Sequence, residues 1–344
     1  MEASTIPGGE RRLLARSPLA RVPDRALRWG LTVLAGLILA LIVYFFIRLF
    51  GEAKPAFEAQ GLLGFVFEND WNPSRGAYGA LPLVVGTLIT SALALLIGVP
   101  IAVAAALYTS ELSPARLRGP LTILVELLAA VPSVVYGLWG IFYLAPNIKP
   151  AEQWFADAFS FIPFVGGGTV TIPNCFVAGL VLAIMILPIV SAISREVIST
   201  VPPDHKEAAL ALGATRWEMI KISILPYCRS GIVGGAMLGL GRAIGETIAV
   251  TILIGGSTQM VEHLFGQSNS LAAVIANEFG EATGVHRSAL FDCGLVLFVL
   301  TLFVNGLARW FVVRANRSVG PPRAEEHRSA AATAALAADT AAGA

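Results

Sequence analysis

An arginine and a glutamate lie inside one apolar stretch in the second half of the chain. Arg242 and Glu246 stand four residues apart between Gly239 and Thr251. A charge left alone in a bilayer costs from about 2.5 to more than 10 kcal/mol, so such residues usually face a bundle interior or a watery path. Residues four apart share one face of a helix. The spacing therefore predicts either a structural ion pair or a polar site within a membrane.

The chemistry that such a site favours is the handling of an anion. An arginine offers a fork of donors that matches phosphate or carboxylate oxygens, which a lysine cannot do. The nearby glycines at 235 and 239 thin the helix surface and permit close approach. A carboxylate repels a fully ionised anion but accepts a hydrogen bond from a protonated one, which favours phosphate over sulfate. We include Thr247 and Thr251, which follow on the same stretch, in the predicted substrate pathway.

Glu126 is a second acidic residue in an apolar segment, and it precedes Pro132, where a kink is expected. Three roles are open to it. It neutralises Arg242, it lines the pathway, or it stays protonated as a buried hydrogen-bond donor that positions its helix.

The elements that carry these residues belong to a membrane protein. The chain of 344 residues is 56% hydrophobic and 14% charged, with a mean hydropathy of +0.72, which a water-soluble core does not accommodate. We predict an all-α polytopic protein with six transmembrane helices, because each apolar run approaches the roughly 20 residues that a bilayer requires. The runs are Trp29–Ile47, Leu81–Tyr108, Leu121–Leu144, Phe176–Ile193, Gly231–Ser257 and Phe291–Val313.

The positions of Lys and Arg predict the orientation. Eighteen of the 24 lie before the first run, between runs two and three, between runs four and five, or in the last residues of run six and beyond it. Positive charge near the ends of spans tends to stay cytoplasmic. Both termini and the segment between runs four and five are therefore expected in the cytoplasm. The first run is expected to be an uncleaved anchor, because no small-residue cleavage site follows it.

The segment between runs four and five predicts two short helices. Asp204 and Glu207 have the spacing of a capping box, which indicates a helix over residues 205–212. Gly213 then supplies the positive φ of a helix end, and Thr215 with Glu218 forms a second capping box. Pro226 is expected to end or kink the second helix.

This segment resembles the EAA loop of ABC-importer permeases. The resemblance rests on Glu207-Ala208-Ala209, Gly213 and Leu225-Pro226. Ser223 departs from the pattern, which usually carries Ile at that position. In that family the two short helices dock into a groove on the ATPase subunit, so the resemblance implies an attachment surface. We call residues 199–229 the coupling loop. Its expected contact residues are Glu207, Ala208, Ala209, Gly213, Leu225 and Pro226.

The stretch from Arg242 to Thr251 is similar to the fifth span of phosphate-specific ABC permeases, and of the PstC type in particular. The similarity also covers 126–137 and 275–279, and it extends over most of residues 80–315. It implies the type I ABC-importer permease fold in a bacterial inner membrane. It also implies a second homologous permease of the PstA type, two cytoplasmic ATPase subunits, an extracytoplasmic phosphate-binding protein, and inorganic phosphate as the substrate.

The rest of the chain is divided by composition. We expect a basic cytoplasmic tail at 1–28, a first transmembrane helix at 29–50, an external loop at 51–80, the permease domain at 81–314 and a disordered tail at 315–344. In the external region, aromatic residues such as Trp71 are expected at the lipid headgroups or in contact with a binding protein. Residues 270–282 are expected to form a short helix that turns Glu278 to the aqueous vestibule.

Several function classes are excluded or disfavoured. The sequence has no G-x-x-x-x-G-K-[ST] phosphate loop, so we expect a transport subunit that is not itself an enzyme and that draws ATP energy from a partner. The three cysteines are expected far apart, without a disulfide or metal site. No cofactor and no nucleic-acid partner is expected. The alternatives are a permease for sulfate, molybdate or phosphonate, and an ion-coupled secondary carrier, which the coupling loop disfavours.

Overall fold

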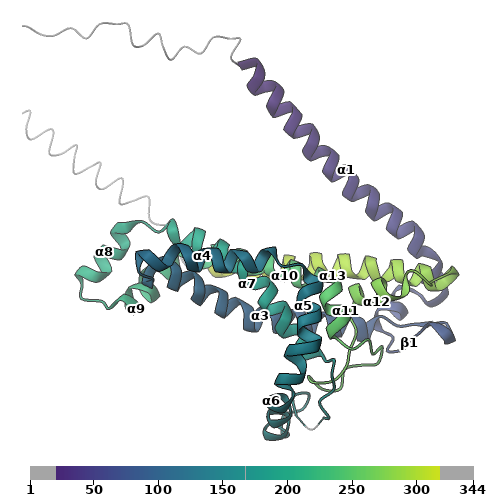
Figure 1. Cartoon of the computed structure of the whole chain (residues 1–344). Coiled ribbons are helices and arrows are strands. Elements are labelled where there is room, and N and C mark those ends of the chain that lie inside the picture. Colours follow the sequence, from purple (N-terminus) through teal and green to yellow (C-terminus); the bar gives the residue numbers. More distant parts are fainter. Residues whose placement is uncertain (1–20, 167, 318–344) are drawn as a thin grey trace, which may run out of the picture.

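The computed structural model describes residues 21–166 and 168–317, and these residues are mostly helical (Figure 1). Two short strands, β1 (Trp71–Asn72) and β2 (Ala77–Tyr78), pair antiparallel. The helices are α1 (Arg21–Gln60), α2 (Leu62–Phe67), α3 (Leu81–Leu107), α4 (Ala115–Ala130), α5 (Ser133–Trp139), α6 (Ala145–Ala158), α7 (Cys175–Ser199), α8 (Pro203–Ala211), α9 (Arg216–Met219), α10 (Leu225–Gly245), α11 (Ile248–Leu253), α12 (Leu271–Glu278) and α13 (Gly284–Arg317).

Four helical segments in this part of the chain are long and apolar enough to cross a membrane. They are Ala26–Glu58, Leu81–Leu112, Cys175–Ser199 and Gly284–Trp310. Ala115–Ala130 and Ser133–Ala158 make a fifth if the pair, bent by 91°, is taken as one span. The run expected as span five is divided between α10 and α11. The all-α membrane fold is confirmed, whereas six spans and two cytoplasmic termini stay predictions.

The centre of the bundle is formed by α3 and α7, which lie along each other. Two glycines allow this approach. A Cβ at Gly98 would stand 2.9 Å from the carbonyl oxygen of Ala183, and one at Gly179 would stand 2.7 Å from the Cβ of Leu93. Small residues that let helix backbones come close are typical of membrane bundles, where van der Waals packing replaces the hydrophobic drive.

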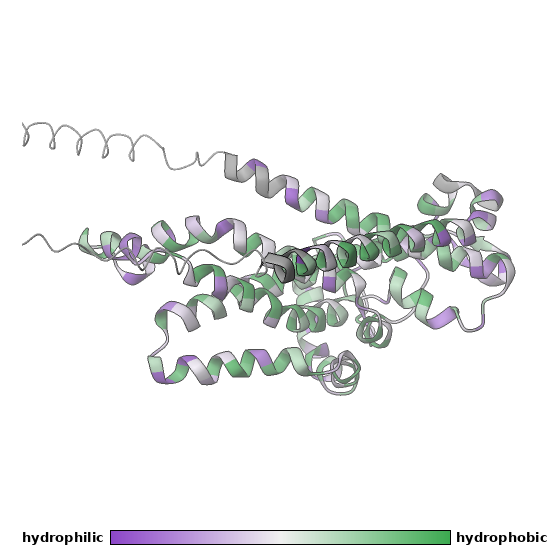
Figure 2. Cartoon of the chain, turned by 90° about the horizontal axis from the view of Figure 1, so that it is seen from above, coloured by the Kyte–Doolittle hydropathy of each residue, from purple (hydrophilic) through white to green (hydrophobic). Residues whose placement is uncertain are grey.

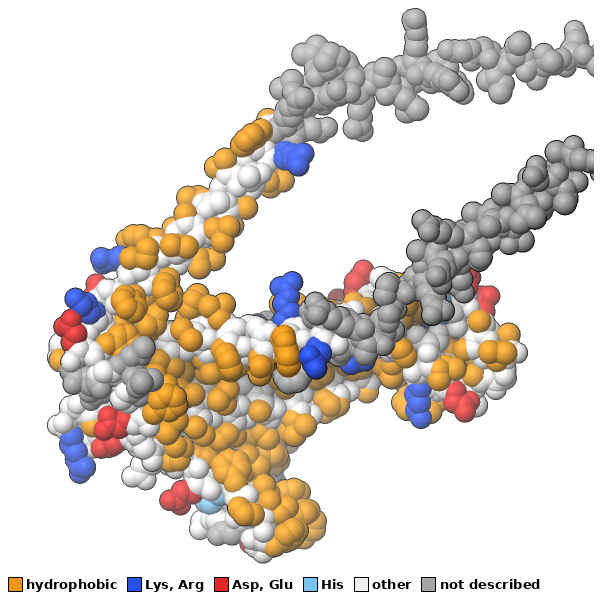
Figure 3. All heavy atoms as spheres, turned by 180° about the vertical axis from the view of Figure 1, so that it is seen from behind, with side chains coloured by type: hydrophobic (Ala, Val, Ile, Leu, Met, Phe, Trp, Pro, Cys, Tyr) orange, Lys and Arg blue, Asp and Glu red, His pale blue; other side chains and the backbone are white. Residues whose placement is uncertain are grey.

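Charged and apolar surfaces are separated along the bundle. Apolar residues run along the helices, and the charged side chains gather mainly toward the two ends (Figures 2 and 3). At one end lie α8 and α9, and at the other lie the β1–β2 hairpin and α12 (Figure 1). Helix α1 packs on α13 through its second half, whereas its first half projects away from the bundle. Every side chain from 26 to 48 is exposed.

The hairpin end has a buried aromatic core, which corrects the expectation that Trp71 lies at the headgroups. Trp71 is 2% exposed and packs edge-on between Phe65 and Tyr78. Its Nε1 donates to the carboxylate of Glu278 at 3.2 Å, and that carboxylate also contacts Nε2 of His286 at 2.8 Å. The short helix around 270–278 is confirmed, but Glu278 joins the hairpin to α12 and α13 and is not turned to open solvent.

Candidate functional site

The predicted fifth span is broken at Glu246. Helix α10 ends at Gly245, Glu246 adopts an extended ψ of 123°, and α11 begins at Ile248. One oxygen of Glu246 accepts a hydrogen bond from the backbone N–H of Ala249 at 3.4 Å, so this carboxylate serves the start of α11. The expectation that Arg242 and Glu246 share one helix face is therefore wrong, because the helix that would align them stops between them.

Arg242 has an exposed side chain near the end of α10. Among the ion pairs of the described residues, none joins Arg242 to Glu246. The guanidinium lies close enough to Tyr136 on α5 for its charge to act on the phenol.

The two threonines after Glu246 direct their hydroxyls to the backbone. Thr251 Oγ1 donates to the carbonyl oxygen of Thr247 at 2.8 Å, and Thr247 Oγ1 donates to that of Gly245 at 3.3 Å. These bonds occupy the hydroxyl protons and leave oxygen lone pairs, which accept hydrogen bonds from a donor. Their place in a substrate pathway stays a prediction.

Glu126 lies at a different place from the one proposed for neutralising Arg242. Its Oε1 contacts Nη2 of Arg195 on α7 at 2.9 Å, and the Glu126 side chain is 57% exposed. The pair joins α4 to α7. Glu126 is therefore not a buried hydrogen-bond donor, and its ion-pair partner is Arg195.

A second break lies beside the first. The chain leaves α4 at Ala130, passes through the extended Val131 and Pro132, and resumes as α5. This is the expected behaviour of a residue before proline. The hydroxyl of Tyr136 donates to the carbonyl oxygen of Leu128 at 2.7 Å and so ties the two sides of the bend together.

The two broken helices pack on each other through α5 and α11. A Cβ at Gly137 would stand 2.8 Å from Cδ1 of Ile252 and 3.3 Å from Cα of Ala249. Only a glycine permits this distance without rearrangement. The contact brings the bend at Pro132 and the break at Glu246 into one region. Arg242 and Tyr136 lie at this junction, and we take it as the candidate pathway site.

The coupling loop has the two short helices that its pattern predicts. Gly213 has φ +86°, and the Thr215–Glu218 capping box forms in full. The Asp204 cap is wrong: α8 begins at Pro203 after Pro202, and Asp204 lies in its first turn without a capping bond from its side chain. The prolines start the helix two residues earlier because their φ is already helical. After α9, a π-helical turn at Ile220–Ile224 leads into α10, with Pro226 in the first turn.

The expected contact residues of the loop lie on two faces. Glu207, Ala208, Gly213 and Pro226 are exposed, whereas Ala209 is 7% exposed and Leu225 is half-buried. Two large apolar side chains join the outer face, since Leu212 is 90% exposed and Trp217 is 55% exposed. Exposed apolar side chains are typical of a protein–protein contact surface where they form a contiguous patch.

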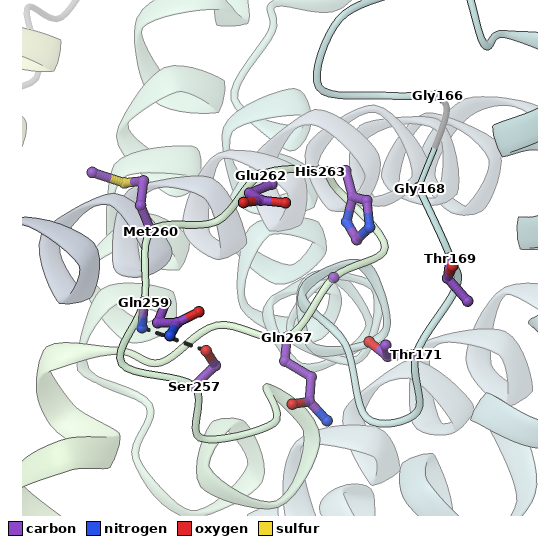
Figure 4. Close-up of a pocket in the computed structure, with 11 residues that line it drawn as sticks. Gly166, Gly168, Thr169, Thr171, Ser257, Gln259, Met260, Glu262, His263 and Gln267 are labelled. Carbon is purple, nitrogen blue, oxygen red and sulfur yellow. Dashed lines mark hydrogen bonds between the residues drawn. The ribbon is translucent and has the colours of Figure 1, made fainter.

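A polar cleft of about 650 Å³ lies between the loop that follows α6 and the loop that follows α11 (Figure 4). It forms where two loops are joined, because the N–H of Leu264 donates to the carbonyl oxygen of Phe164 at 2.7 Å. Figure 4 shows side chains of both loops around the cleft, and Nδ1 of His263 is buried there without a hydrogen-bond partner among the described residues. The polar side chains that line it are Thr169, Thr171, Ser257, Gln259, Glu262, His263 and Gln267.

The comparisons with known proteins agree with this geometry. Residues 98–317 match the family described as the inner membrane component of binding-protein-dependent transport systems. The chain belongs to this family. It is 47% identical to the phosphate transport system permease protein PstC of Pasteurella multocida, over 74% of this chain and 81% of that protein. It is 39% identical to the PstC protein of Xylella fastidiosa strain Temecula1, over 93% and 97%. The PstC-type resemblance is thereby confirmed.

Solved structures confirm the ABC-importer permease fold. A bacterial alginate ABC transporter in complex with an alginate pentasaccharide-bound periplasmic protein has a chain that matches 86% of this permease with a TM-score of 0.55. The two sequences are 19% identical, and the match covers 98% of that chain. The family region of this permease includes the coupling loop and both breaks, whereas α1 lies outside it.

Two residues of this permease escaped sequence reasoning. Tyr136 lies in the similar stretch 126–137 but carries no predicted role, and the bend at Pro132 brings it near Arg242. Asp292 on α13 is fully buried, and both of its carboxylate oxygens lack a hydrogen-bond partner among the described residues. A single acidic residue in the sixth apolar run was the signal for it, since intramembrane acids are functional candidates by default.

Proposed function

We propose that this chain is the PstC-like permease subunit of an ATP-driven importer of inorganic phosphate in a bacterial inner membrane. The observation that carries the proposal is an exposed guanidinium at a broken membrane helix, in a chain whose relatives are named as phosphate permeases. An arginine suits this task because its fork binds two oxygens of one phosphate.

The break supplies what a continuous helix lacks. Interrupted helices in transporters leave backbone groups and side chains facing a cavity, which is where substrate sites are usually found. At this junction Arg242 contributes positive charge, and Glu246 contributes a carboxylate that can accept a hydrogen bond from a protonated phosphate. The hydroxyl oxygens of Thr247 and Thr251 add acceptors along α11. Glu126, paired with Arg195 on the flank of the bundle, is an element of the pathway wall in this proposal.

The partners follow from the surfaces. The outer face of the coupling loop, with Leu212 and Trp217 exposed, fits a groove on a cytoplasmic ATPase. We propose two such subunits, which hydrolyse ATP in place of this chain, beneath this permease and a homologous permease of the PstA type. An extracytoplasmic phosphate-binding protein delivers the substrate at the hairpin end. The cycle is alternating access, in which ATPase closure moves the spans through the coupling loop.

The deciding experiment is uptake of labelled phosphate into vesicles that hold the purified complex, with the phosphate-binding protein and ATP supplied. We expect uptake that requires the binding protein and ATP and that excess sulfate does not compete away. Glu246→Gln, which keeps the size of the side chain, is expected to lower phosphate flux and to weaken discrimination against sulfate. Uptake of sulfate or molybdate in preference to phosphate would make this a permease for another oxyanion, and uptake without ATP would make it a secondary carrier.

A further inference from the structure

The inner face of the coupling loop is packed onto the helix bundle. Side chains from α8, α9 and the π-helical turn after α9 are buried against the ends of three long helices. We call this group the loop cluster. It consists of Ala106, Leu107, Ile198, Val201, Ala209, Met219, Ile220, Ile224 and Cys228. Apolar packing of this kind holds the loop in place but is not directional.

One polar contact crosses from the coupling loop to α3. Lys206 on α8 places its Nζ 2.6 Å from Oε1 of Glu111. The two side chains are 23% and 13% exposed, so both charges are largely removed from water. The ion pairs Arg48–Glu52 and Lys54–Glu58 on α1 differ in this respect, since their side chains are at least half exposed.

Glu111 belongs to a π-helical turn, Tyr108–Leu112, that continues α3 toward the loop. A π-helical turn has wider hydrogen-bond spacing than an α-helix, and such turns are frequent at functional positions. The coupling loop contains a second π-helical turn at Ile220–Ile224, which leads into α10. Two of the three long helices that bear on the loop cluster, α3 and α10, therefore reach it through a turn of this kind.

The ion pair lies where three helices meet. The charges of Lys206 and Glu111 are both close enough to act on the buried thiol of Cys228 on α10. The Sγ of Cys228 contacts the carbonyl oxygen of Val197 on α7 at 3.5 Å. A displacement of α8 would thus be transmitted to α3 through the ion pair, and to α7 and α10 through the apolar packing.

We propose that Lys206 and Glu111 are a positioning pair that transmits movement of the coupling loop to α3. The inference rests on the proposed docking of an ATPase to the outer face of the loop. A pair of desolvated charges resists separation, because either charge left alone in that place is strongly unfavourable. When α8 moves, Glu111 follows Lys206, and α3 carries the displacement along α7 to the centre of the bundle.

The test uses the whole complex in vesicles, with ATP hydrolysis measured with and without phosphate-loaded binding protein. Lys206→Met and Glu111→Gln each remove one charge, and Lys206→Glu with Glu111→Lys exchanges them. The matched control is Lys54→Met, which breaks a Lys–Glu pair that is exposed. ATPase content is measured in every sample, so that stimulation is expressed per assembled complex.

We expect stimulation to fall about tenfold in each single variant, within the usual range of coupling between sites. The exchanged pair is expected to regain most of it, and the control to keep it. Stimulation that persists in assembled single variants, or that stays lost in an assembled exchanged pair, overturns the inference. If the single variants do not assemble, Lys206→Met with Glu111→Leu decides, because an apolar pair restores packing. Assembly without stimulation then supports transmission, and assembly with full stimulation refutes it.

The wild-type complex in the same vesicles separates this inference from the proposed function. If hydrolysis responds to a binding protein loaded with another oxyanion, only the assignment of phosphate falls, and the variants are compared with that ligand. If no ATPase co-purifies with the wild-type chain, docking and transmission fall together. A normal wild type beside unaffected single variants overturns the ion pair alone.

Discussion

The coupling loop and the broken fifth span are both short helices joined by a turn, yet they form for different reasons. In the loop, the turn and the cap arise within six residues, where Gly213 takes φ +86° and Thr215 bonds to Glu218. In the span, the stretch from 239 to 251 is mostly apolar around Arg242 and Glu246, and its spacing predicts a continuous helix. The helix instead ends at Gly245, and α5 packs on α11 beside the break through Gly137. The sequence pattern therefore shows the turn of the loop, whereas the break in the span lies where two distant segments pack.

The largest effect is expected at the broken span. Arg242→Lys retains the positive charge but loses the fork of donors, so we expect most phosphate uptake to be lost at equal membrane abundance. Arg48→Lys, which changes an exposed arginine on α1, is the control and should transport normally. Normal uptake by Arg242→Lys would show that the guanidinium does not recognise phosphate in the pathway.

The next effect is expected at the turn of the coupling loop. Gly213→Val places a β-branched residue at positive φ, at a cost of about 1 to 3 kcal/mol. Gly61 also has positive φ and open space around it, so Gly61→Val is a matched control away from the coupling loop. We expect the ATPase to co-purify poorly with Gly213→Val only. Equal ATPase recovery in both variants would contradict a docking role for the loop.

A smaller effect is expected at the contact between α5 and α11, which has no counterpart in the coupling loop. Gly137→Ala brings a methyl group into the side chain of Ile252, and overpacking of this kind costs about 1 to 3 kcal/mol. We expect a lower melting temperature of the purified complex, recovered in part by Ile252→Val. Gly119→Ala on α4, where nothing lies within 4 Å, is the control. A melting temperature that Gly137→Ala leaves unchanged would show that the breaks do not depend on this packing.

The smallest effect is expected at the cap of α9. Hydrogen bonds from Thr215, first from its backbone N–H and then from its side chain, lower the pKa of Glu218. The carboxylate therefore supports the cap above the ordinary glutamate pKa, and this support is lost as the pH falls through the lowered value. We expect ATPase attachment to weaken below about pH 4. Glu218→Gln should lessen this pH dependence of ATPase attachment. If the variant and the wild type have the same pH profile, the cap does not contribute to docking.

The sequence alone determined the membrane class, the family and the shape of the coupling loop. The apolar composition by itself indicates a protein that lies in a bilayer. The loop motif is predictable because it depends on contacts between residues three or four apart. Gly213 and the Thr215–Glu218 box are therefore where their pattern predicts them. The start of α8 was misplaced by two residues because Pro202 and Pro203 already have helical φ and compete with Asp204 for the cap.

Only the tertiary structure decided how the charged residues meet. The spacing of Arg242 and Glu246 predicts one face of a continuous helix, but the helix ends at Gly245, close to where α5 packs against α11. Glu126 meets Arg195 and Lys206 meets Glu111, pairs separated by 69 and 95 residues. Such partners depend on which helices lie side by side, and one sequence specifies that only through the sum of its packing contacts.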